Sequence, residues 1–583
     1  MKNITLTING IETTVPENYS VLQAAEGLGL NIPRLCFLKD INETSSCRLC
    51  VVDVKNIRGL KNSCTLQVQE GMEVQTDTNE INDSVVQNLQ LLASNHIFEC
   101  WACEREHNCE LLDLMRRYNV ENIYGENPNF FKKERLINDT SPSIVLDSGK
   151  CILCGRCVTA CEIQSGLSIL DFNERGNETY VGPALFHNME DSGCIYCGKC
   201  IQACPVAAIK EKSEIDQVLE VLRDPSKKVI VSAAPSIRVA LGEEFGSKIG
   251  ENVEGKMYTS FKKAGFDEIM DTNFSADLTI LEEGTEFINR VKNNGVLPLF
   301  TSCSPGWINY IEQYEPQYLA NLSTAKSPQQ MAGAVSKHYY AEKLGYKKED
   351  VVFVSIMPCI AKKHEAKRPE MEFEGIRDVD YVLTTREYAR LLKRKGIDFM
   401  KLEDSEPHGD LAKYTGAGVI FGATGGVMEA ALRTVSEVLE GKETPIEFTE
   451  VRGLEGIKEA TYNVAGIDVN VAVVHGGSSI KEFFAMMKKS KKQYHFVEFM
   501  ACTGGCINGG GQPIHSAKIQ DNVNIREERT KTIYEMDKDK PLRKSHNNPV
   551  ITKLYSEWIG EPGSHIAHDL LHTHYGKRNY YKD

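Results

Sequence analysis

The first eighty residues alternate apolar and polar positions in the way that small sheets do. Apolar residues occupy every second position from Ile4 to Ile8, Asn9-Gly10 suits a two-residue hairpin turn, and a second strand follows. Ser20 is placed to cap a short helix over residues 21–28. The order strand, turn, strand, helix predicts a β-grasp module.

The last two-thirds of the chain has a different pattern. From about residue 213, short unbroken apolar runs alternate with helix-like segments. Runs of this kind are typical of strands buried on both faces, so we expect a large α/β domain built on a mostly parallel sheet. The predicted strands are residues 229–235, 296–300, 351–356, 419–421, 469–474 and 494–499.

Composition limits the classes of function. The chain has 583 residues, of which 41% are apolar, enough for three or four domains of about 150 residues with ordinary cores. The formal net charge of −14 argues against general binding to nucleic acid or to anionic membranes. We find neither a basic and apolar leader nor an apolar run of about 18 residues, so we expect a cytoplasmic protein without nucleic-acid or membrane partners.

The 19 cysteines are distributed unevenly along the chain. Fifteen of them precede residue 205, and four serve the remaining two-thirds. Because disulfides are rare in cytoplasmic proteins, such a set indicates metal or redox sites. The front of the chain is therefore expected to handle electrons, and the larger back part to hold a separate site.

The first group of cysteines lies in the predicted β-grasp module and has the spacing C-x10-C-x2-C-x13-C. Its members are Cys36, Cys47, Cys50 and Cys64. Four thiolates in this fold predict a [2Fe–2S] cluster, although the first gap is longer than the x4 gap of plant-type ferredoxins. A structural zinc site is the alternative.

A mixed group follows, with the spacing H-x3-C-x2-C-x5-C. It consists of His96, Cys100, Cys103 and Cys109, and His107 inside the last gap is a rival ligand. One histidine and three cysteines can hold a zinc ion or a [4Fe–4S] cluster. In a cluster, imidazole in place of a thiolate lowers the negative charge and shifts the reduction potential.

After a polar connection near residues 122–140, one cysteine motif occurs twice. The motif C-x2-C-x2-C-x3-C is the spacing of bacterial ferredoxins with two [4Fe–4S] clusters, in which the fourth cysteine of each run binds the other cluster. We therefore assign Cys151, Cys154, Cys157 and Cys204 to one cluster, and Cys194, Cys197, Cys200 and Cys161 to the second.

Three loops in the back part, each directly after a predicted strand, carry the remaining four cysteines. They are Thr301-Ser302-Cys303-Ser304-Pro305-Gly306-Trp307, Met357-Pro358-Cys359 and the glycine-rich stretch Met500-Ala501-Cys502-Thr503-Gly504-Gly505-Cys506. Loops at the carboxyl ends of strands converge in open α/β sheets, so we expect these thiols to meet at one place. The three loops resemble the signature loops of the [FeFe]-hydrogenases, which interconvert protons and H2, and the resemblance extends over nearly the whole chain.

The resemblance implies a catalytic H-cluster, which is a [4Fe–4S] cubane bridged by a cysteine to a two-iron unit with carbonyl, cyanide and amine-dithiolate ligands. Matched by motif, Cys359, Cys502 and Cys506 hold the cubane, and Cys506 is also the bridge. Lys362 is the matching lysine, and the other implied pocket residues are Ala234, Pro235, Ser236, Gln329, Met357 and Met500. The resemblance also favours clusters over zinc in the front groups, and it implies dedicated proteins that mature the two-iron unit.

A route for protons is implied as well. Cys303 is the matching first relay, and Glu283, Ser323, Glu286 and Arg290 continue the path to the surface. Independently of the resemblance, residues 283, 286 and 290 have the spacing of one helical face. A salt-bridged surface stripe is the alternative.

One position departs from the family pattern. Most relatives have two adjacent cysteines in the first loop, the second being the fourth cubane ligand, whereas this chain has Cys303-Ser304. Three outcomes are open. Ser304 ligates through its oxygen, or Cys303 becomes the ligand and leaves the relay to Ser304, or the cubane is labile and the protein weakly active or inactive.

Taken together, the sequence predicts a multidomain α/β protein with four parts. These are a β-grasp [2Fe–2S] ferredoxin module (1–79), a one-histidine, three-cysteine [4Fe–4S] module (80–125), a two-[4Fe–4S] ferredoxin domain (140–212) and a catalytic H-cluster domain (213–583). The resemblance implies a ferredoxin hydrogenase that exchanges electrons with a ferredoxin-like carrier.

Two other hypotheses stay open. One is an iron–sulfur subunit of another oxidoreductase, and the second is a non-catalytic redox sensor or iron–sulfur protein, which Ser304 keeps open. Near the end of the chain, His565, His568 and His572 have helical spacing, which we interpret as a solvated helix rather than a metal site.

Overall fold

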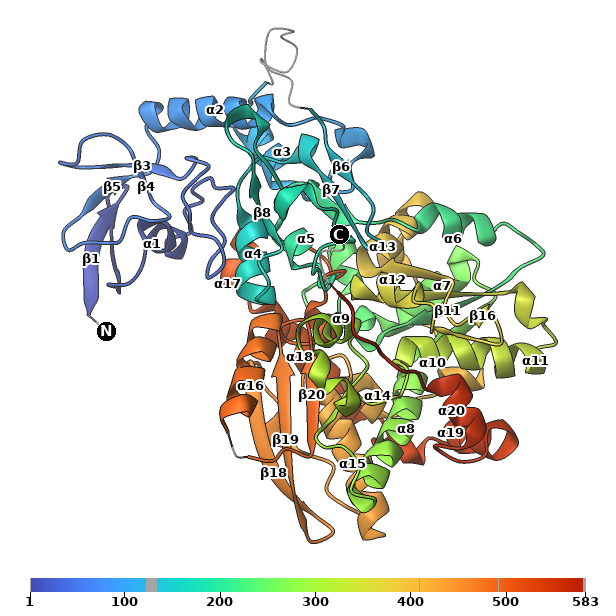
Figure 1. The fold of residues 1–583 in the computed structure, drawn as a ribbon. Coiled ribbons are helices and arrows are strands. Elements are labelled where there is room, and N and C mark those ends of the chain that lie inside the picture. Colours follow the sequence, from blue (N-terminus) through green and yellow to red (C-terminus); the bar gives the residue numbers. More distant parts are fainter. Residues whose placement is uncertain (1, 122–133, 408, 491, 580–583) are drawn as a thin grey trace.

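The computed structural model describes residues 2–121, 134–407, 409–490 and 492–579. The front of the chain forms an arm that lies against a larger body made by the rest (Figure 1). Most of the polar connection predicted near residues 122–140 lies outside these ranges. Among the described helices, none is long and apolar enough to cross a membrane.

The first module is a five-stranded mixed sheet with one short helix, as the sequence predicts. Asn9 and Gly10 both have positive φ, which a two-residue hairpin of the favoured twist requires. Ser20 caps the helix by accepting from the Gln23 amide, and the Gln23 side chain accepts from the Ser20 amide. The strand order is β2-β1-β5-β3-β4, and the elements are β1 (Asn3–Ile8), β2 (Ile11–Pro16), α1 (Val21–Gly27), β3 (Val51–Val54), β4 (Lys61–Asn62) and β5 (Glu73–Gln75).

Two small modules connect this sheet to the body. The mixed His/Cys group lies between two helices, and the repeated cysteine motif lies around two helices that pack on each other. The elements of the first are α2 (Asn79–Ser94) and α3 (Glu110–Arg117). Those of the second are β6 (Ile137–Asn138), β7 (Ile144–Asp147), α4 (Arg156–Ser165), β8 (Leu170–Asn173), β9 (Tyr180–Pro183), α5 (Lys199–Ala203) and β10 (Ile209–Glu211).

The body contains two four-stranded sheets, where the sequence predicts one. The first is parallel throughout, in the order β12-β11-β14-β17. The second has the order β13-β20-β19-β18, and only its edge strand β18 is antiparallel. The strands are β11 (Lys228–Ala233), β12 (Glu268–Asp271), β13 (Leu299–Phe300), β14 (Val351–Met357), β17 (Tyr381–Thr384), β18 (Ile457–Val464), β19 (Ile467–His475) and β20 (Phe496–Met500), and a separate hairpin is formed by β15 (Glu372–Phe373) and β16 (Ile376–Arg377).

Two predicted strands differ from the structure. Residues 419–421 lie at the end of helix α14 (Gly416–Ile420), so that prediction is wrong. This short apolar run lies between glycines and is buried on every side. A segment buried on every side lacks the hydrophobic periodicity by which a strand is distinguished from a helix. The run 296–300 forms a strand only at Leu299–Phe300, because Val296 is half exposed and Pro298 has no amide to donate to a neighbouring strand.

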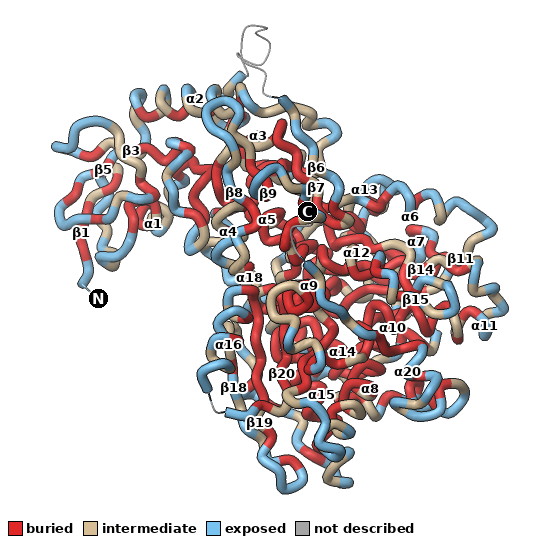
Figure 2. The backbone as a smooth tube through the Cα atoms, in the orientation of Figure 1, coloured by how far each residue is buried: buried red, intermediate tan, exposed pale blue. Residues whose placement is uncertain are grey.

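Helices cover both sheets, and the buried backbone is concentrated between them (Figure 2). The longest is α8, which begins directly after β12 and carries residues 283, 286 and 290. The helices of the body are α6 (Ile215–Val221), α7 (Glu254–Ala264), α8 (Thr272–Lys292), α9 (Pro305–Tyr314), α10 (Pro328–Val335), α11 (Ala341–Lys343), α12 (Ala361–Ala366), α13 (Thr385–Arg394), α14 (Gly416–Ile420), α15 (Gly426–Glu440), α16 (Gly477–Lys489), α17 (Ala517–Asn522), α18 (Ile525–Asp539), α19 (Pro549–Leu554) and α20 (His565–Leu571).

Candidate active site

A cavity of about 70 Å³ lies where the carboxyl ends of strands from the two sheets meet. Strand β14 leads to Cys359, β13 leads to Cys303, and β20 leads to Cys502 and Cys506. The cysteine loops therefore converge as the strand pattern predicts, except that they come from two sheets facing one site. The cavity is lined by Ala234, Pro235, Thr272, Ala276, Cys303, Ser304, Pro305, Pro328, Gln329, Met357, Pro358, Cys359, Lys362, Phe421, Met500, Cys502, Gly505, Cys506 and Gly509.

Glycines of the last loop allow it to lie in a tight space. A Cβ on Gly505, whose φ is +86°, would lie 2.7 Å from the Thr424 amide nitrogen. A Cβ on Gly509 would lie 2.3 Å from the Pro358 carbonyl oxygen. Both contacts are too short for a side chain, so the loop presses on protein backbone as well as facing the cavity.

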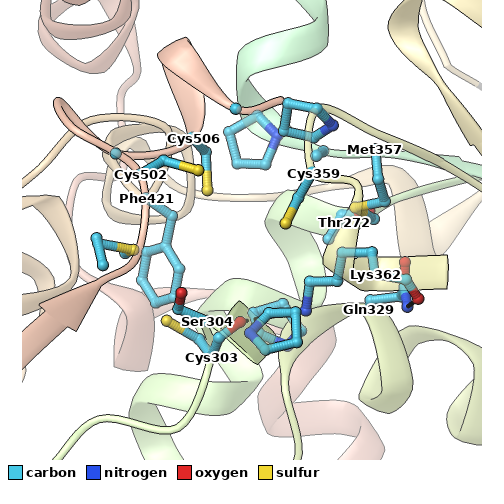
Figure 3. Close-up of a pocket in the computed structure, with 18 of the residues that line it drawn as sticks. Thr272, Cys303, Ser304, Gln329, Met357, Cys359, Lys362, Phe421, Cys502 and Cys506 are labelled. Atoms are coloured by element: carbon cyan, nitrogen blue, oxygen red, sulfur yellow. Dashed lines mark hydrogen bonds between the residues drawn. The ribbon is translucent and has the colours of Figure 1, made fainter. Parts of the chain in front are cut away.

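Four thiols and the Ser304 hydroxyl face one another around this cavity. In Figure 3 the side chains of Cys359, Cys502 and Cys506 lie on one side, with Cys303 and Ser304 across the space from them. Burial, followed by the neighbouring Cys502, raises the pKa of Cys506 to about 12. Burial and Cys502 likewise raise the pKa of Cys359. Thiols of this kind do not ionise alone, but a bound metal deprotonates a coordinating thiol, so the set fits an iron–sulfur cluster.

Lys362 brings a positive charge to the cavity. Its Nζ atom donates to the Cys303 carbonyl at 3.1 Å, to Ser327 Oγ at 2.7 Å and to Glu365 Oε2 at 2.9 Å. Gln329 lies beside it, and its Oε1 atom is buried without a hydrogen-bond partner among the described residues. The rest of the wall, including Pro235, Met357 and Met500, is apolar, so the cavity suits a compact, dry and anionic group.

Ser236 and Gln512 support the last loop from outside the cavity. The hydroxyl of Ser236 donates to the Cys506 carbonyl at 3.2 Å, and the Gln512 amide donates to Ser236 Oγ at 3.2 Å. Ser236 is thus placed behind Cys506 and does not line the cavity. These bonds hold the backbone of Cys506 in position.

Ser304 and Cys303 have different surroundings. The Ser304 hydroxyl accepts from the Ala501 amide at 3.2 Å, next to Cys502 in the chain. Burial raises the pKa of Cys303 well above its ordinary value, and the next causes are the charges of Glu283 and Cys506. Cys303 therefore lies between the cavity and the buried acid, while Ser304 is tied to the cysteine loop.

A row of polar groups leads from Cys303 to the surface along α8. Glu283 is fully enclosed, and both of its carboxyl oxygens lack an ordinary hydrogen-bond partner among the described residues. Burial, and secondly the charge of Glu286, raises the pKa of Glu283 to about 8. Ser323 Oγ donates to Glu286 Oε2 at 2.9 Å, and Arg290 pairs with Glu286 Oε1 at 2.6 Å. Glu286 is therefore bonded to Ser323 and Arg290, and Glu283 lies between this group and Cys303 as a charge neighbour of both. The buried Glu283 does not belong to a surface stripe.

The cysteines of the first module form two close pairs. Hydrogen-bond contacts join Cys36 with Cys47, and Cys50 with Cys64, and all four are buried. Two pairs of thiols match a cluster with two irons.

His96 is oriented in the way that a metal-binding histidine is. Its Nδ1 atom is 3.0 Å from the Lys150 carbonyl oxygen, which leaves Nε2 free to bind a metal. The rival residue His107 has a side chain that is 82% exposed. Its position makes it the weaker candidate.

The repeated motif surrounds two separate places. A cavity of about 20 Å³ is lined by Cys151, Cys154, Cys157 and Cys204, together with apolar residues. Cys161 is not in its lining. The charge neighbours that raise the pKa of Cys200, after burial, are Cys197, Cys194 and Cys161. The geometry therefore agrees with the crossed assignment of the two fourth cysteines.

Sequence reasoning missed several residues around the cavity. Ser327, Glu365 and Gln512 hold Lys362 and Cys506 in place, and Thr272, Ala276 and Phe421 complete the wall. A signal existed only for Glu365, which follows Lys362 by three residues in a helix and can therefore pair with it. The others come from distant segments that no motif connects.

Comparisons with protein families match almost all of this arrangement. The family described as "Iron only hydrogenase large subunit, C-terminal domain" matches residues 227–510, and "Iron hydrogenase small subunit" matches 523–578. A "2Fe-2S iron-sulfur cluster binding domain" matches 1–79, an "NADH-ubiquinone oxidoreductase-G iron-sulfur binding region" matches 87–123, and a "4Fe-4S dicluster domain" matches 150–208. The chain therefore contains both [2Fe–2S] and [4Fe–4S] binding domains.

Similar proteins extend over the full chain. It is 44% identical to "Iron hydrogenase 1" of Clostridium pasteurianum over 98% of this chain and 100% of that protein. It is 43% identical to the "NADP-reducing hydrogenase subunit HndD" of Solidesulfovibrio fructosivorans over 99% and 100%. A solved apo [FeFe]-hydrogenase from Chlamydomonas reinhardtii, at 39% identity and a TM-score of 0.57, covers 63% of this chain and 100% of its own. This chain belongs to the family of the iron-only, or [FeFe], hydrogenases.

Proposed function

We propose that this protein interconverts protons and H2 at an H-cluster and exchanges electrons with a ferredoxin-like carrier. The observation that carries the proposal is the single cavity lined by Cys359, Cys502, Cys506 and Lys362, with Cys303 between it and the buried Glu283. A scaffold needs no enclosed acid beside its cluster, so this arrangement favours catalysis over a non-catalytic role. The division into 1–79, 80–125, 140–212 and 213–583 is part of the proposal.

In the catalytic domain, Cys359, Cys502 and Cys506 would hold the cubane, and Cys506 would also bridge to the two-iron unit. When bound, the two-iron unit supplies the redox chemistry that combines protons and electrons. Lys362, fixed by Ser327 and Glu365, is positioned to attract the cyanide ligands, which carry negative charge. Met357, Met500, Ala234 and Pro235 exclude water around it.

Protons would move between the cavity and Glu283 through Cys303. Cys303 and Glu283 are both protonated at neutral pH, because burial raises the pKa of each. Each can therefore donate a proton and regain one from its neighbour, which a permanently charged pair cannot do. Ser323 links this inner pair to Glu286.

Electrons would reach the cavity through the two-cluster domain. A Cβ on Gly510, in the last catalytic loop, would lie 2.4 Å from the Cys197 carbonyl oxygen. Lys199 Nζ donates to the Asn508 carbonyl at 2.7 Å. The cluster of Cys194, Cys197, Cys200 and Cys161 would therefore be the last donor before the catalytic cluster.

We propose that Ser304 takes the place of the fourth cubane ligand and that Cys303 keeps the relay. Ser304 is bonded to the Ala501 amide beside Cys502, whereas the electrostatic neighbours of Cys303 are headed by Glu283. Oxygen is a harder ligand than sulfur, so an oxygen ligand would shift the reduction potential of the cubane. Alternatively, the iron of the cubane nearest Ser304 has no protein ligand. An oxygen-bound iron and an iron without a protein ligand differ in their electron paramagnetic resonance spectra.

The test is to mature the protein anaerobically together with Ser304→Cys and record infrared spectra and H2 evolution from a reduced dye. Carbonyl and cyanide bands with activity in both proteins would support a working enzyme. A changed electron paramagnetic resonance spectrum of the cubane in Ser304→Cys would support Ser304 as the ligand position. Bands and activity in Ser304→Cys alone would contradict the proposal and favour a redox-sensing or iron–sulfur role for the natural chain.

A further inference from the structure

The proton path ends at a residue that is a poor relay. Arg290 donates to Glu286 and to the carbonyls of Val296, Ala320, Asn321 and Leu322. A guanidinium holds its proton at any pH a protein meets, so Arg290 can fix Glu286 but cannot pass protons on. Beyond Glu286, another group or water has to exchange them.

Glu286 has a second polar neighbour, Thr324. The Glu286 Oε2 atom accepts from the Thr324 amide at 2.9 Å and from Thr324 Oγ1 at 3.2 Å, in addition to the bond from Ser323. Thr324 Oγ1 also lies 2.8 Å from Nδ1 of His572. A hydroxyl between a carboxylate and an imidazole can accept a proton from one while it gives its own to the other.

His572 comes from the end of α20, inside the segment that matches the small-subunit family. It is 8% exposed, so the prediction of a solvated helix is wrong for this histidine, although it holds for His565 and His568. Its Nε2 atom lies 3.1 Å from Glu282 Oε2, and Glu282 also accepts from the Tyr555 hydroxyl and the Gly563 amide. The Glu282 carboxylate therefore fixes the orientation of the His572 ring, with Nδ1 towards Thr324.

Backbone bonds hold His572 and Thr324 together. The Lys326 amide donates to the Leu571 carbonyl at 2.7 Å, and the Thr573 amide donates to the Thr324 carbonyl at 2.7 Å. His572 and Ala325 form an isolated antiparallel bridge. The contact is therefore built into the main chain and does not depend on a long, mobile side chain.

We propose that Thr324 and His572 form a second branch of the proton path, which leaves the row proposed above at Glu286. The proposal rests on the proposed function. Protonated Glu286 gives its proton to Thr324 Oγ1, and Thr324 gives its own proton to His572 Nδ1. The sequence converts a carboxylic acid and a neutral imidazole into a carboxylate and an imidazolium, with Thr324 unchanged, and no electrons move. The reverse sequence brings protons in.

The surface end of this branch is a group of histidines. The ring of exposed His568 stacks on that of His572 with centroids 5.3 Å apart, and exposed His574 lies 6.1 Å from His568. An imidazole ring has one nitrogen that donates and one that accepts a proton, so such a group can pass protons between His572 and solvent. The titratable groups around His572 are Glu282, Glu286, Tyr555 and His568.

The test compares Thr324→Val, which removes only the hydroxyl, with His572→Gln, which keeps a polar group that cannot be protonated. H2 evolution and its ratio between H2O and D2O are measured in the matured full-length protein. We expect each variant to lose roughly three- to tenfold in rate, because loss of a proton-transfer group slows turnover while Glu286, whose side chain is 14% exposed, can still exchange protons with solvent. The isotope ratio should rise, and the double variant should be no slower than the slower single.

Controls distinguish a proton relay through His572 from a purely structural contact. His565 lies on the same helix, but its side chain is exposed and its ion-pair partner is Asp569. The rate of His565→Gln should therefore equal that of the natural chain. Added imidazole should restore part of the rate of His572→Ala and none of that of Thr324→Val. A slower rate without a changed isotope ratio and without rescue would overturn the relay and leave His572 a structural contact.

Infrared bands distinguish failure of this inference from failure of the proposed function. Missing carbonyl and cyanide bands in the natural chain would count against the function itself. Bands in all proteins, with natural rates in Thr324→Val and His572→Gln, would overturn the branch alone. If His572→Gln loses its bands through misfolding, Thr324→Val decides.

Discussion

At the scale of single residues, two neighbouring glutamates on α8 have opposite surroundings. Glu286 accepts hydrogen bonds from Ser323 and Thr324 and pairs with Arg290, whereas Glu283 is enclosed without an ordinary partner among the described residues. Burial raises the pKa of Glu283 to about 8, with Glu286 as the second cause. The same residue type thus has a raised pKa at one position and is an ion-pair partner about one turn later.

Replacing Glu283 by glutamine should block the inner part of the proton path. Glutamine has the same shape but exchanges no proton, and removing such a group costs about 10²–10⁴-fold in rate. In the natural chain, H2 evolution should fall as pH rises through about 8, because Glu283 then loses the proton that it donates. Dye-driven H2 evolution between pH 6 and 9 measures both effects.

Glu283→Asp is the matched control, since it keeps a carboxylic acid on a side chain that is one methylene group shorter. We expect it to retain more activity than Glu283→Gln, with infrared bands equal to those of the natural chain in both. Equal rates for Glu283→Gln and the natural chain would show that protons bypass Glu283. An unchanged fall in rate near pH 8 in the glutamine variant would assign that pH dependence to another group.

The same scale shows what the sequence could and could not predict of the site. The position of the three cysteine loops at strand ends predicts that their thiols meet, and the resemblance to the [FeFe]-hydrogenases identifies Lys362 beside them. Thr324 and His572 are 248 residues apart, and no pattern joins them. Ser327 and Gln512 were missed for the same reason, since hydrogen bonds between distant segments leave no periodic trace.

At the scale of elements, one tryptophan fixes two of the cysteine loops against each other. Helix α9 begins at Pro305, directly after Ser304. An amide at the first position of a helix has no acceptor within the helix, so proline, which lacks this amide, suits the position. Trp307, in the first turn of this helix, stacks on Phe499 of β20 with centroids 4.0 Å apart and donates from Nε1 to the Thr301 carbonyl at 3.0 Å. This stacking therefore adds to the hydrogen bond between the Ala501 amide and Ser304 in holding the first and last cysteine loops together.

Trp307→Ala should lower the free energy of unfolding of the catalytic domain by roughly 3–5 kcal/mol, because it empties a fully buried ring volume. Trp307→Phe should cost less, about 1–3 kcal/mol, mainly for the Thr301 carbonyl left without its donor. Denaturant unfolding of the protein without its two-iron unit, followed by circular dichroism, measures both. Equal stability of the phenylalanine variant and the natural chain would show that the hydrogen bond contributes nothing.

The elements themselves were predictable where periodicity was strong. The hairpin, the capped first helix and the strands of residues 229–235, 351–356 and 469–474 correspond to observed elements. The division of the strands between two sheets was not predictable, because buried parallel strands have similar compositions and the sequence does not show which strands pair with each other. This division matters for function, since it allows loops from two directions to enclose one cavity.

At the scale of the whole molecule, the proposed cluster sites form a branched chain. Asn42, in the first module, donates to the Cys36 and Cys154 carbonyls, and Arg156 donates to the Cys36 carbonyl. The second module reaches the same place, because Arg105 donates to the Cys204 carbonyl and His96 lies beside Lys150. Both front modules therefore contact the cluster site of Cys151, Cys154, Cys157 and Cys204, and electrons from either would meet there.

This branching predicts unequal effects of removing single clusters. Cys50→Ala, which disables the first module, and Cys103→Ala, which disables the second, should each lower ferredoxin-driven H2 evolution only in part, because the other branch stays connected. Cys154→Ala should lower it far more, since both branches join at its cluster. Iron content and paramagnetic resonance spectra would verify that each variant lacks only the intended cluster, and dye-driven activity would show that the catalytic cluster is intact. Loss of all ferredoxin-driven activity in Cys50→Ala, with Cys103→Ala unaffected, would instead mean that electrons follow one linear route through the first module and that the second serves another purpose.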